Sequence, residues 1–159
     1  MPFKIRSIRP ADIGDIIRIA EECDLSPWSS NDYLEEAKRG DSTLLRLESE
    51  SGETVGFLVG RRVLSASSLT HFDAEIYNIG VRRSVQRSGC GTILLEEFIE
   101  RCAAEMVETV WLDVRISNSS AISFYNSFGF SEFTLRRRFY NDPVEDGMVM
   151  KLTIGKQNS

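Results

Sequence analysis

The apolar positions of the chain follow two spacings, and each spacing predicts a different kind of element. Short alternating or apolar runs predict β-strands over residues 3–8, 43–48, 54–63, 73–82, 109–116, 130–139 and 147–154. Apolar residues that recur every three or four positions predict helices in the segment that Pro10 opens and over residues 31–38, 90–105 and 118–128. This order of strands and interleaved helices predicts a mixed α/β sheet.

Capping residues set the ends of the shorter helices. Ser29, Ser30 or Asn31 can cap the helix over 31–38, and Gly40 ends it. Gly129 ends the helix over 118–128 in the same way. These positions agree with the apolar spacing, so the two signals support the same elements.

The strand over 73–82 has a simple alternating pattern. Strict alternation puts Glu75, Tyr77, Ile79 and Val81 on one face of the strand. It puts Ile76, Asn78 and Gly80 on the opposite face.

Composition narrows the class of protein. The 159 residues fit one domain, which we place over 1–153 with a tail over 154–159. A net charge of -5 argues against general nucleic-acid binding. Three cysteines without CxxC spacing and a single histidine argue against a disulfide framework and against a metal site. No apolar run is long enough to cross a bilayer, so we expect a cytoplasmic protein without a membrane partner.

The segment QRSGCGTILLEEF (86–98) places two glycines one residue apart before a helix-spaced apolar run. Unpaired N–H groups at the start of such a helix can bind an anion. The loop is no Rossmann fingerprint, because Leu94 stands where the third glycine is needed, and it has no GK[ST] of a Walker loop. A tight turn without a ligand is the alternative for this loop taken alone.

A second motif gives the loop a context. With Gln86 the loop reads QxxGxG, and residues 118–130 read NSSAISFYNSFGF. Together they resemble the two acetyl-CoA-binding signatures of the GCN5-related N-acetyltransferase (GNAT) superfamily, and the likeness extends over nearly the whole chain. The bacterial ribosomal-protein N-terminal acetyltransferase branch is especially similar, through PWS (27–29), NIGV (78–81), WLDVRISN (111–118) and RRRFY (136–140).

The resemblance implies a fold and a co-substrate. It implies a mostly antiparallel sheet with flanking helices, in which the fourth and fifth strands splay apart and hold the pantetheine arm of acetyl-CoA. Ile79, Gly80 and Val81 would line that arm, and Asn118 would bond the co-substrate from the start of its helix while also capping it. The backbone N–H groups that would cradle the pyrophosphate belong to Arg87, Ser88, Gly89, Cys90, Gly91 and Thr92. Arg82 and Arg83 are either solvated charges or partners of the 3′-phosphate.

Acetyl transfer from a thioester to an amine requires a neutral amine, a stabilised oxyanion and a protonated leaving thiol. A carboxylate can take the proton from an α-amino group, whose pKa is about 8. The resemblance places Asp113 where the branch has its glutamate base, one methylene shorter. Glu75 stands where histone-acetylating relatives carry their base, and Asp73 is a weaker candidate. The structural alternative for either acid is an ion pair with an arginine, which for Asp113 would be Arg115.

Tyr125 matches the family tyrosine whose hydroxyl protonates the departing thiolate. The alternative is an aromatic packing residue beside Phe124 and Phe128. A backbone N–H of the 73–82 strand, that of Ile79 or a neighbour, would stabilise the oxyanion. Cys90 has no histidine near it in sequence, so we interpret it as a packing residue and not as a nucleophile.

The acceptor amine is the least defined part. In the branch that this chain resembles, a protein N-terminus lies between two loops, which here would be residues 25–29 and 139–147. Trp28, Phe139 and Tyr140 would form an aromatic wall, and Glu145 and Asp146 could attract a basic substrate. Their structural alternatives are core packing for Trp28 and solvated charge for the acids.

Three functions therefore stay open. The first is a protein N-terminal acetyltransferase, for example of a ribosomal protein. The second is an acetyltransferase of a small amine such as a polyamine, amino sugar or drug, and the third is a non-catalytic acyl-CoA sensor. The oligomeric state stays open as well, a homodimer included.

Overall fold

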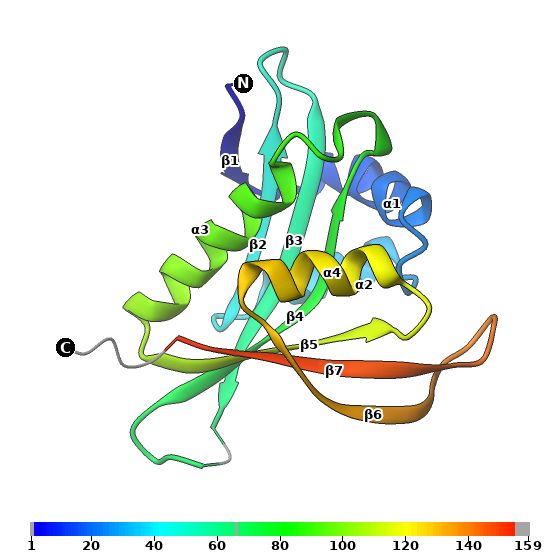
Figure 1. The fold of residues 1–159 in the computed structure, drawn as a ribbon. Helices are drawn as coiled ribbons and strands as arrows, with labels where there is room; N and C mark the ends of the chain where they lie inside the picture. Colours follow the sequence, from blue (N-terminus) through cyan, green and yellow to red (C-terminus); the bar gives the residue numbers. More distant parts are fainter. Residues whose placement is uncertain (1, 66, 155–159) are drawn as a thin grey trace. The chain divides into compact units, whose positions relative to one another are not determined.

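A computed structural model describes residues 2–65 and 67–154. Its elements follow the predicted order, with bounds that differ from the predicted ones by a few residues (Figure 1). They are β1 (Lys4–Ser7), η1 (Pro10–Asp12), α1 (Ile13–Glu22), α2 (Ser30–Ala37), β2 (Ser42–Glu48), β3 (Thr54–Leu64), β4 (Phe72–Val81), η2 (Arg83–Val85), α3 (Cys90–Ala104), β5 (Val107–Arg115), α4 (Ser119–Phe128), β6 (Ser131–Tyr140) and β7 (Glu145–Thr153). The predicted alternation of strands and helices is confirmed.

Short polar side chains fix the start of α2. The Ser29 hydroxyl accepts the backbone N–H of Asp32 at 3.1 Å, and the Asp32 carboxylate accepts the N–H of Ser29 at 2.7 Å. This reciprocal capping box satisfies two donors that the first turn leaves without partners. Of the three predicted capping residues, Ser29 is the one that caps the helix.

The strands form one sheet of seven strands in the order β1-β2-β3-β4-β5-β7-β6. β4 and β5 are parallel, with Ile76 beside Leu112, whereas the other pairings described are antiparallel. The predicted fold class, a mixed α/β fold with a mostly antiparallel sheet, is confirmed. The splay of β4 and β5 stays a prediction.

The described chain divides into two compact units by its internal contacts. Unit 1 consists of residues 2–61 and 77–101, and unit 2 of residues 62–65, 67–76 and 102–154. β3 and β4 each contribute residues to both units. The single domain over 1–153 stays a prediction, and residues 155–159 of the predicted tail lie outside the described part of the chain.

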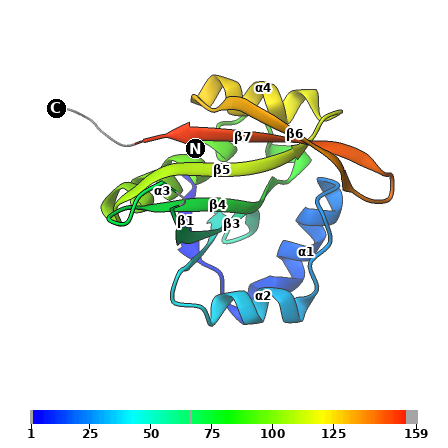
Figure 2. The ribbon, with the colours of Figure 1, turned by 90° about the horizontal axis from the view of Figure 1, so that it is seen from below.

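In unit 1, helices cover both faces of the β2–β3 strands. α1 and α2 lie together in Figure 2, and their buried residues pack against Phe57 and Val59 of β3. Gly56 points to the opposite face, where an added Cβ would meet Leu94 of α3 at 3.2 Å. The apolar side chains that α1 and α2 bury against β3 are those of Ile13, Ile16, Ile19, Ala20 and Tyr33. The helical spacing of the α1 positions is what brings them to one face.

Unit 2 has its own apolar core around β5. Val110 and Leu112 of β5 are buried beside Leu152 and Met150 of β7. Figure 2 shows α4 alongside β6 and β7, and an added Cβ at Gly129 would lie 3.3 Å from Leu152. β6 is the edge strand of the sheet on this side, and its residues are almost all exposed.

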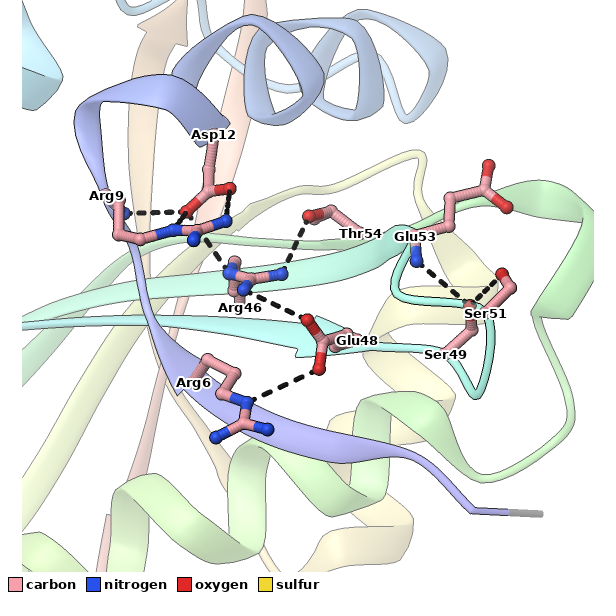
Figure 3. A network of polar contacts seen from close by, with 9 residues as sticks. All are labelled: Arg6, Arg9, Asp12, Arg46, Glu48, Ser49, Ser51, Glu53 and Thr54. Carbon is pink, nitrogen blue, oxygen red and sulfur yellow. Dashed lines mark hydrogen bonds and ion pairs between the residues drawn. The ribbon is translucent and has the colours of Figure 1, made fainter.

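A network of charges holds the start of α1 to the sheet in unit 1 (Figure 3). Asp12 and Arg46 are 5% and 4% exposed, and Oδ2 of Asp12 lies 3.1 Å from Nε of Arg46. Arg46 also reaches Glu48 at 3.1 Å and donates to the Thr54 hydroxyl at 3.3 Å. The hydrogen bonds from Arg9, together with the charge of Arg46, hold the pKa of Asp12 below its usual value. Every charge of this buried network therefore has an opposite charge beside it.

We predict that Arg46→Met destabilises the fold by about 3 kcal/mol, because it leaves the Asp12 carboxylate buried without one of its cations. Arg6→Ala is the matched control, since the Arg6 side chain is 52% exposed and pairs with Glu48 at 3.3 Å. An exposed pair of this kind contributes less than about 1 kcal/mol. Urea unfolding of both variants checks the difference, and equal losses of stability would contradict it.

Candidate functional site

The glycine loop in unit 1 forms a strand-to-helix turn with two unusual backbone positions. Arg87 and Gly89 have φ of 70° and 86°. The N–H of Ile93 donates to the Gly89 carbonyl at 3.0 Å, which begins the helical bonding of α3. The N–H groups of the first α3 turn, which starts at Cys90, precede this bond and have no partner within the helix. These N–H groups lie at the positive end of the α3 helix dipole, so the turn can bind an anion.

Side chains fix the loop to the strand before it. The Gln86 side-chain amide donates to the carbonyl of Val81, the last residue of β4, at 2.9 Å. Ser88 closes the turn, since its N–H donates to the Val85 carbonyl at 3.3 Å and its hydroxyl donates to the same oxygen. From the sequence, Gln86 was known only as the first residue of the QxxGxG motif. In the structure, its side chain anchors the loop to β4.

Two other residues of this region have structural contacts. Cys90 is buried, with its sulfur 3.3 Å from the Ser88 hydroxyl. Arg82 turns toward β3, where its Nε donates to the Thr54 carbonyl at 3.2 Å. The burial of Cys90 agrees with a packing role. The Arg82 side chain binds the backbone of β3.

The alternation predicted along β4 is wrong between Tyr77 and Gly80. Strict alternation puts these two residues on opposite faces, yet both face the residues under α1 and α2. Tyr77 packs against that apolar cluster, and an added Cβ at Gly80 would lie 3.2 Å from Phe57 and 3.3 Å from Leu25. The strand therefore departs from its regular pleat over these residues, and a side chain at position 80 has little room.

An aromatic and charged cavity lies beside β4 in unit 1. The Trp28 ring centroid is 5.1 Å from that of Tyr33 and 6.1 Å from that of Tyr77. A cavity of about 580 Å³ next to them is lined by Pro27, Trp28, Asp32, Glu35, Glu36, Arg39, Arg61 and Tyr77. Trp28 is both part of the packing and part of this wall, so neither of its two predicted roles excludes the other.

A buried ion pair lies in the wall of that cavity. Glu36 is 5% exposed, and its carboxylate accepts two hydrogen bonds from the Arg61 guanidinium, at 2.5 and 2.9 Å. Burial alone would raise the pKa of Glu36, but the hydrogen bonds from Arg61 and Ser42 hold it below its usual value. No local pattern signals this pair, because Glu36 and Arg61 are far apart in the chain.

In unit 2, Asp113 is the carboxylate with the most unusual surroundings. Its Oδ1 is buried and lies 3.2 Å from Nε of Arg136, but no hydrogen bond from the described residues reaches it. Burial raises the pKa of Asp113, the charge of Arg136 lowers it, and the charge of Glu75 raises it, with a net shift above the usual value. A carboxylate in this state can accept a proton more readily than an ordinary aspartate.

The other two acids differ from Asp113. Asp73 accepts the indole N–H of Trp111 at 2.9 Å, which gives it a structural contact. Glu75 lies beside Trp111 in the β4–β5 register and close enough to Asp113 to raise its pKa. Unit 2 therefore brings Glu75 and Asp113 together, as two of the predicted catalytic residues.

The structural alternative for Asp113, an ion pair with an arginine, is present, but its arginine is Arg136 and not Arg115. Arg115 does not pair with Asp113 but with Glu145, at 3.1 Å, and it also donates to the carbonyls of Asn141 and Pro143. Both residues point to other neighbours because the β6–β7 hairpin, distant in sequence, supplies better-placed groups. Arg136 of β6 takes the place that we expected Arg115 to fill.

The two acids expected to attract a substrate have partners within unit 2. Glu145 accepts the N–H of Ser117 at 2.7 Å in addition to its contact with Arg115, and these contacts hold its pKa below the usual value. Asp146 accepts the N–H of Arg138 at 2.9 Å. Both carboxylates therefore bind groups of unit 2.

Phe139 and Tyr140 lie on β6 and not in a loop. The expected loop over 139–147 is shorter, because β6 ends at Tyr140 and β7 begins at Glu145. The two rings meet edge to face at 5.0 Å, and the Arg115 guanidinium lies 4.6 Å from the Tyr140 ring. Burial, with a smaller contribution from Asp113, raises the pKa of Tyr140 to about 12. Phe139 remains 44% exposed, so an aromatic surface is available here.

Tyr125 and Asn118 belong to α4. The Asn118 side chain caps the helix by accepting the N–H of Ala121 at 3.2 Å, as predicted. Tyr125 is buried between Phe124 and Phe130, with centroid distances of 5.4 and 5.7 Å. The alternative, aromatic packing, is present with Phe124, but the second ring is Phe130 and not the expected Phe128. The role of Tyr125 as an acid stays a prediction.

The described residues offer neither a cluster of metal ligands nor a membrane-spanning helix. Across residues 2–65 and 67–154, no three His, Cys, Asp or Glu side chains are grouped so that they could hold a metal ion. None of the helices in this part of the chain is long and apolar enough to span a membrane.

Comparison with known proteins identifies the class of this chain as an acyltransferase. The model of the acetyltransferase (GNAT) family matches residues 13–130. The chain belongs to this family, and it is an N-acetyltransferase enzyme.

Particular relatives cover almost the whole chain. The ribosomal protein bS18-alanine N-acetyltransferase of Escherichia coli (strain K12) is 33% identical over 152 residues, which are 94% of this chain and 97% of the relative. The crystal structure of the ribosomal-protein-S18-alanine N-acetyltransferase from Escherichia coli has a TM-score of 0.81 at 29% identity, covering 99% of this chain and 97% of that one. Ard1 from Thermoplasma volcanium has a TM-score of 0.85 at 25% identity, covering 98% and 100%.

Proposed function

We propose that this protein acetylates the N-terminal α-amino group of a protein, with a ribosomal protein as its acceptor. The observation that carries the proposal is the 33% identity to ribosomal protein bS18-alanine N-acetyltransferase over 94% of the chain. An acceptor of that kind would place the enzyme in the cytoplasm.

The residues of unit 1 fit acetyl-CoA. Gly89 has the positive φ that the turn needs, and no atom lies within 4 Å of an added Cβ there, so the backbone is open to an approaching phosphate. The N–H groups over residues 87–92 would hold the pyrophosphate, and Ile79, Gly80 and Val81 would line the pantetheine arm. Bound acetyl-CoA supplies the acetyl group as a thioester.

Asp113 is our choice for the general base. In the proposed step, its carboxylate takes a proton from the α-amino group while the amine nitrogen forms a bond to the acetyl carbon. The raised pKa of Asp113 and its Oδ1 without a hydrogen-bond donor support this choice over Asp73, which the Trp111 indole occupies. Because aspartate is short, a water can relay the proton. Glu75 would act on the rate through its charge beside Asp113.

Tyr125 is our choice for the general acid. Its hydroxyl would give a proton to the sulfur as the carbon–sulfur bond breaks, so that the thiol leaves in neutral form. The aromatic packing of Phe124 and Phe130 fixes the ring and would keep the hydroxyl in place.

Each unit, taken by itself, has groups that suit a peptide acceptor. In unit 1, Trp28 and Tyr77 flank a cavity whose Glu36 carboxylate is neutralised by Arg61, whereas Glu35 has only an exposed pair with Lys38 at 3.3 Å. An aromatic cavity with surplus negative charge suits a basic segment of a peptide. In unit 2, Phe139 and Tyr140 would contact the peptide.

The test of the function is thiol release from acetyl-CoA with three acceptors. They are a peptide with a free N-terminal alanine followed by basic residues, the same peptide N-terminally blocked but carrying lysine, and a polyamine. We expect thiol release with the free N-terminus alone. Release only with the polyamine would replace the proposal by small-amine acetylation. Acetyl-CoA binding without release on any arm would favour a sensor.

The pH dependence of kcat/KM tests Asp113. Because Arg136 lowers and Glu75 raises the pKa of Asp113, the acid limb should move to higher pH in Arg136→Gln and to lower pH in Glu75→Gln. Asp113→Asn should lose at least about 100-fold in rate. If Glu75→Gln loses the rate and Asp113→Asn keeps it, Glu75 is the base instead.

Tyr125→Phe tests the general acid. The variant keeps the ring and its packing but removes the proton donor, so we expect kcat to fall at least about tenfold with little change in acetyl-CoA affinity. Stopped assays of kcat and titration calorimetry with acetyl-CoA measure the two quantities, with the melting temperature as a check of folding. An unchanged kcat would remove Tyr125 from the mechanism.

A further inference from the structure

The last residue of α1 carries a charge that its place in the helix disfavours. Glu22 ends α1, and the last turn of this helix contains no basic residue. Carboxylates are unfavourable at a helix C-terminus, where the dipole is negative. Departures from such local rules concentrate at functional positions, and Glu22 has specific partners elsewhere in unit 1.

Those partners lie at the start of the glycine loop, within unit 1. The Glu22 carboxylate accepts the backbone N–H of Arg83 at 3.0 Å, and its other oxygen lies 3.9 Å from Arg82. The next residue, Cys23, donates its thiol to the Val81 carbonyl at 3.3 Å. The end of α1 thus holds three consecutive residues where β4 turns into the loop.

The end of α1 is itself rigid. Asp24 adopts φ of 57°, the N–H of Leu25 returns to the Ala20 carbonyl at 3.0 Å, and that of Asp24 donates to Glu21 at 3.1 Å. This left-handed closure is the usual way to end a helix firmly. Glu22 and Cys23 are therefore held by a helix buried against the sheet, and not by a flexible segment.

Residues 81–83, which the end of α1 contacts, lead directly into the proposed pyrophosphate turn. Arg82 is held from the other side, because its N–H donates to the Val55 carbonyl at 2.8 Å. Gln86 ties the following residues to the same Val81 carbonyl that Cys23 contacts. A loop that is already fixed in its binding geometry loses less conformational freedom when the anion binds.

We propose that Glu22 is a positioning residue, which fixes the glycine loop for acetyl-CoA through its hydrogen bond to the Arg83 N–H. The inference rests on the proposed binding of acetyl-CoA by this loop, and it does not depend on which amine is acetylated. Glu22 would act on affinity for the co-substrate and not on the chemical step, because its contacts are with the backbone of the loop.

Three variants separate this role from simpler ones. Glu22→Ala removes the acceptor of the Arg83 N–H, whereas Glu22→Gln keeps an oxygen that can accept it but removes the charge. Glu21→Ala is the matched control, since Glu21 is an exposed carboxylate at the same helix end. The melting temperature of each variant reports folding, and removing either charge from this helix end should not lower it.

The measurements are acetyl-CoA affinity by titration calorimetry without an acceptor, and kcat and KM with saturating acceptor. We expect Glu22→Ala to raise Kd and KM for acetyl-CoA about five- to tenfold with kcat unchanged, because the loop loses preorganisation. Glu22→Gln and Glu21→Ala should stay within about twofold of the unaltered protein. Hydrogen exchange at the Arg83 amide should accelerate in Glu22→Ala and stay slow in Glu22→Gln.

Other results would overturn the inference. Equal affinities for the unaltered protein and Glu22→Ala would show that the contact does not position the loop. Equal changes in Glu22→Ala and Glu22→Gln would make the charge, not the hydrogen bond, responsible. A lower melting temperature with unchanged affinity would make Glu22 structural. If the unaltered protein itself bound no acetyl-CoA, the proposed function would fail rather than this role of Glu22.

Discussion

The pairing of buried charges is the constraint on which the rest of this structure depends. A charge removed from water must meet an opposite charge or a set of hydrogen bonds, or the fold loses several kcal/mol. In unit 1, two buried carboxylates meet this requirement and tie together elements that are distant in the chain: Asp12 pairs with Arg46, and Glu36 pairs with Arg61. In unit 2, the half-buried Arg115 and Glu145 pair in the same way.

Asp113 is less completely paired than these carboxylates. It has a cation at 3.2 Å but a buried oxygen that no described donor reaches, and its pKa is raised by burial. A raised carboxyl pKa means that the folded state binds the proton more readily than the unfolded state. Ionised Asp113 therefore lowers stability as the pH rises above the usual aspartate pKa. A cost of this kind is expected at a group that must exchange a proton.

Local patterns predicted the elements and part of the site, whereas contacts between distant segments could not be predicted. Apolar spacing predicted α1, and Ser29 and Gly129 marked helix ends, because these signals act within a few residues. The irregular pleat between Tyr77 and Gly80 and the true partner of Arg115 depend on α1 and on the β6–β7 hairpin. The role proposed for Glu22 had a local signal, an acid at a helix C-terminus, but its partner becomes visible only in the fold.

We conclude that Asp113 of unit 2 is kept able to accept a proton, whereas the buried acids of unit 1, Asp12 and Glu36, are each paired with arginine. The most direct measurement is the pKa of the Asp113 carboxyl by NMR titration of protein labelled with ¹³C at aspartate, assigned with Asp113→Asn. The account predicts a titration above the usual aspartate value of about 3.9. A titration at or below that value would mean that Arg136 pairs Asp113 as firmly as Arg9 and Arg46 pair Asp12, and would contradict its role as the base.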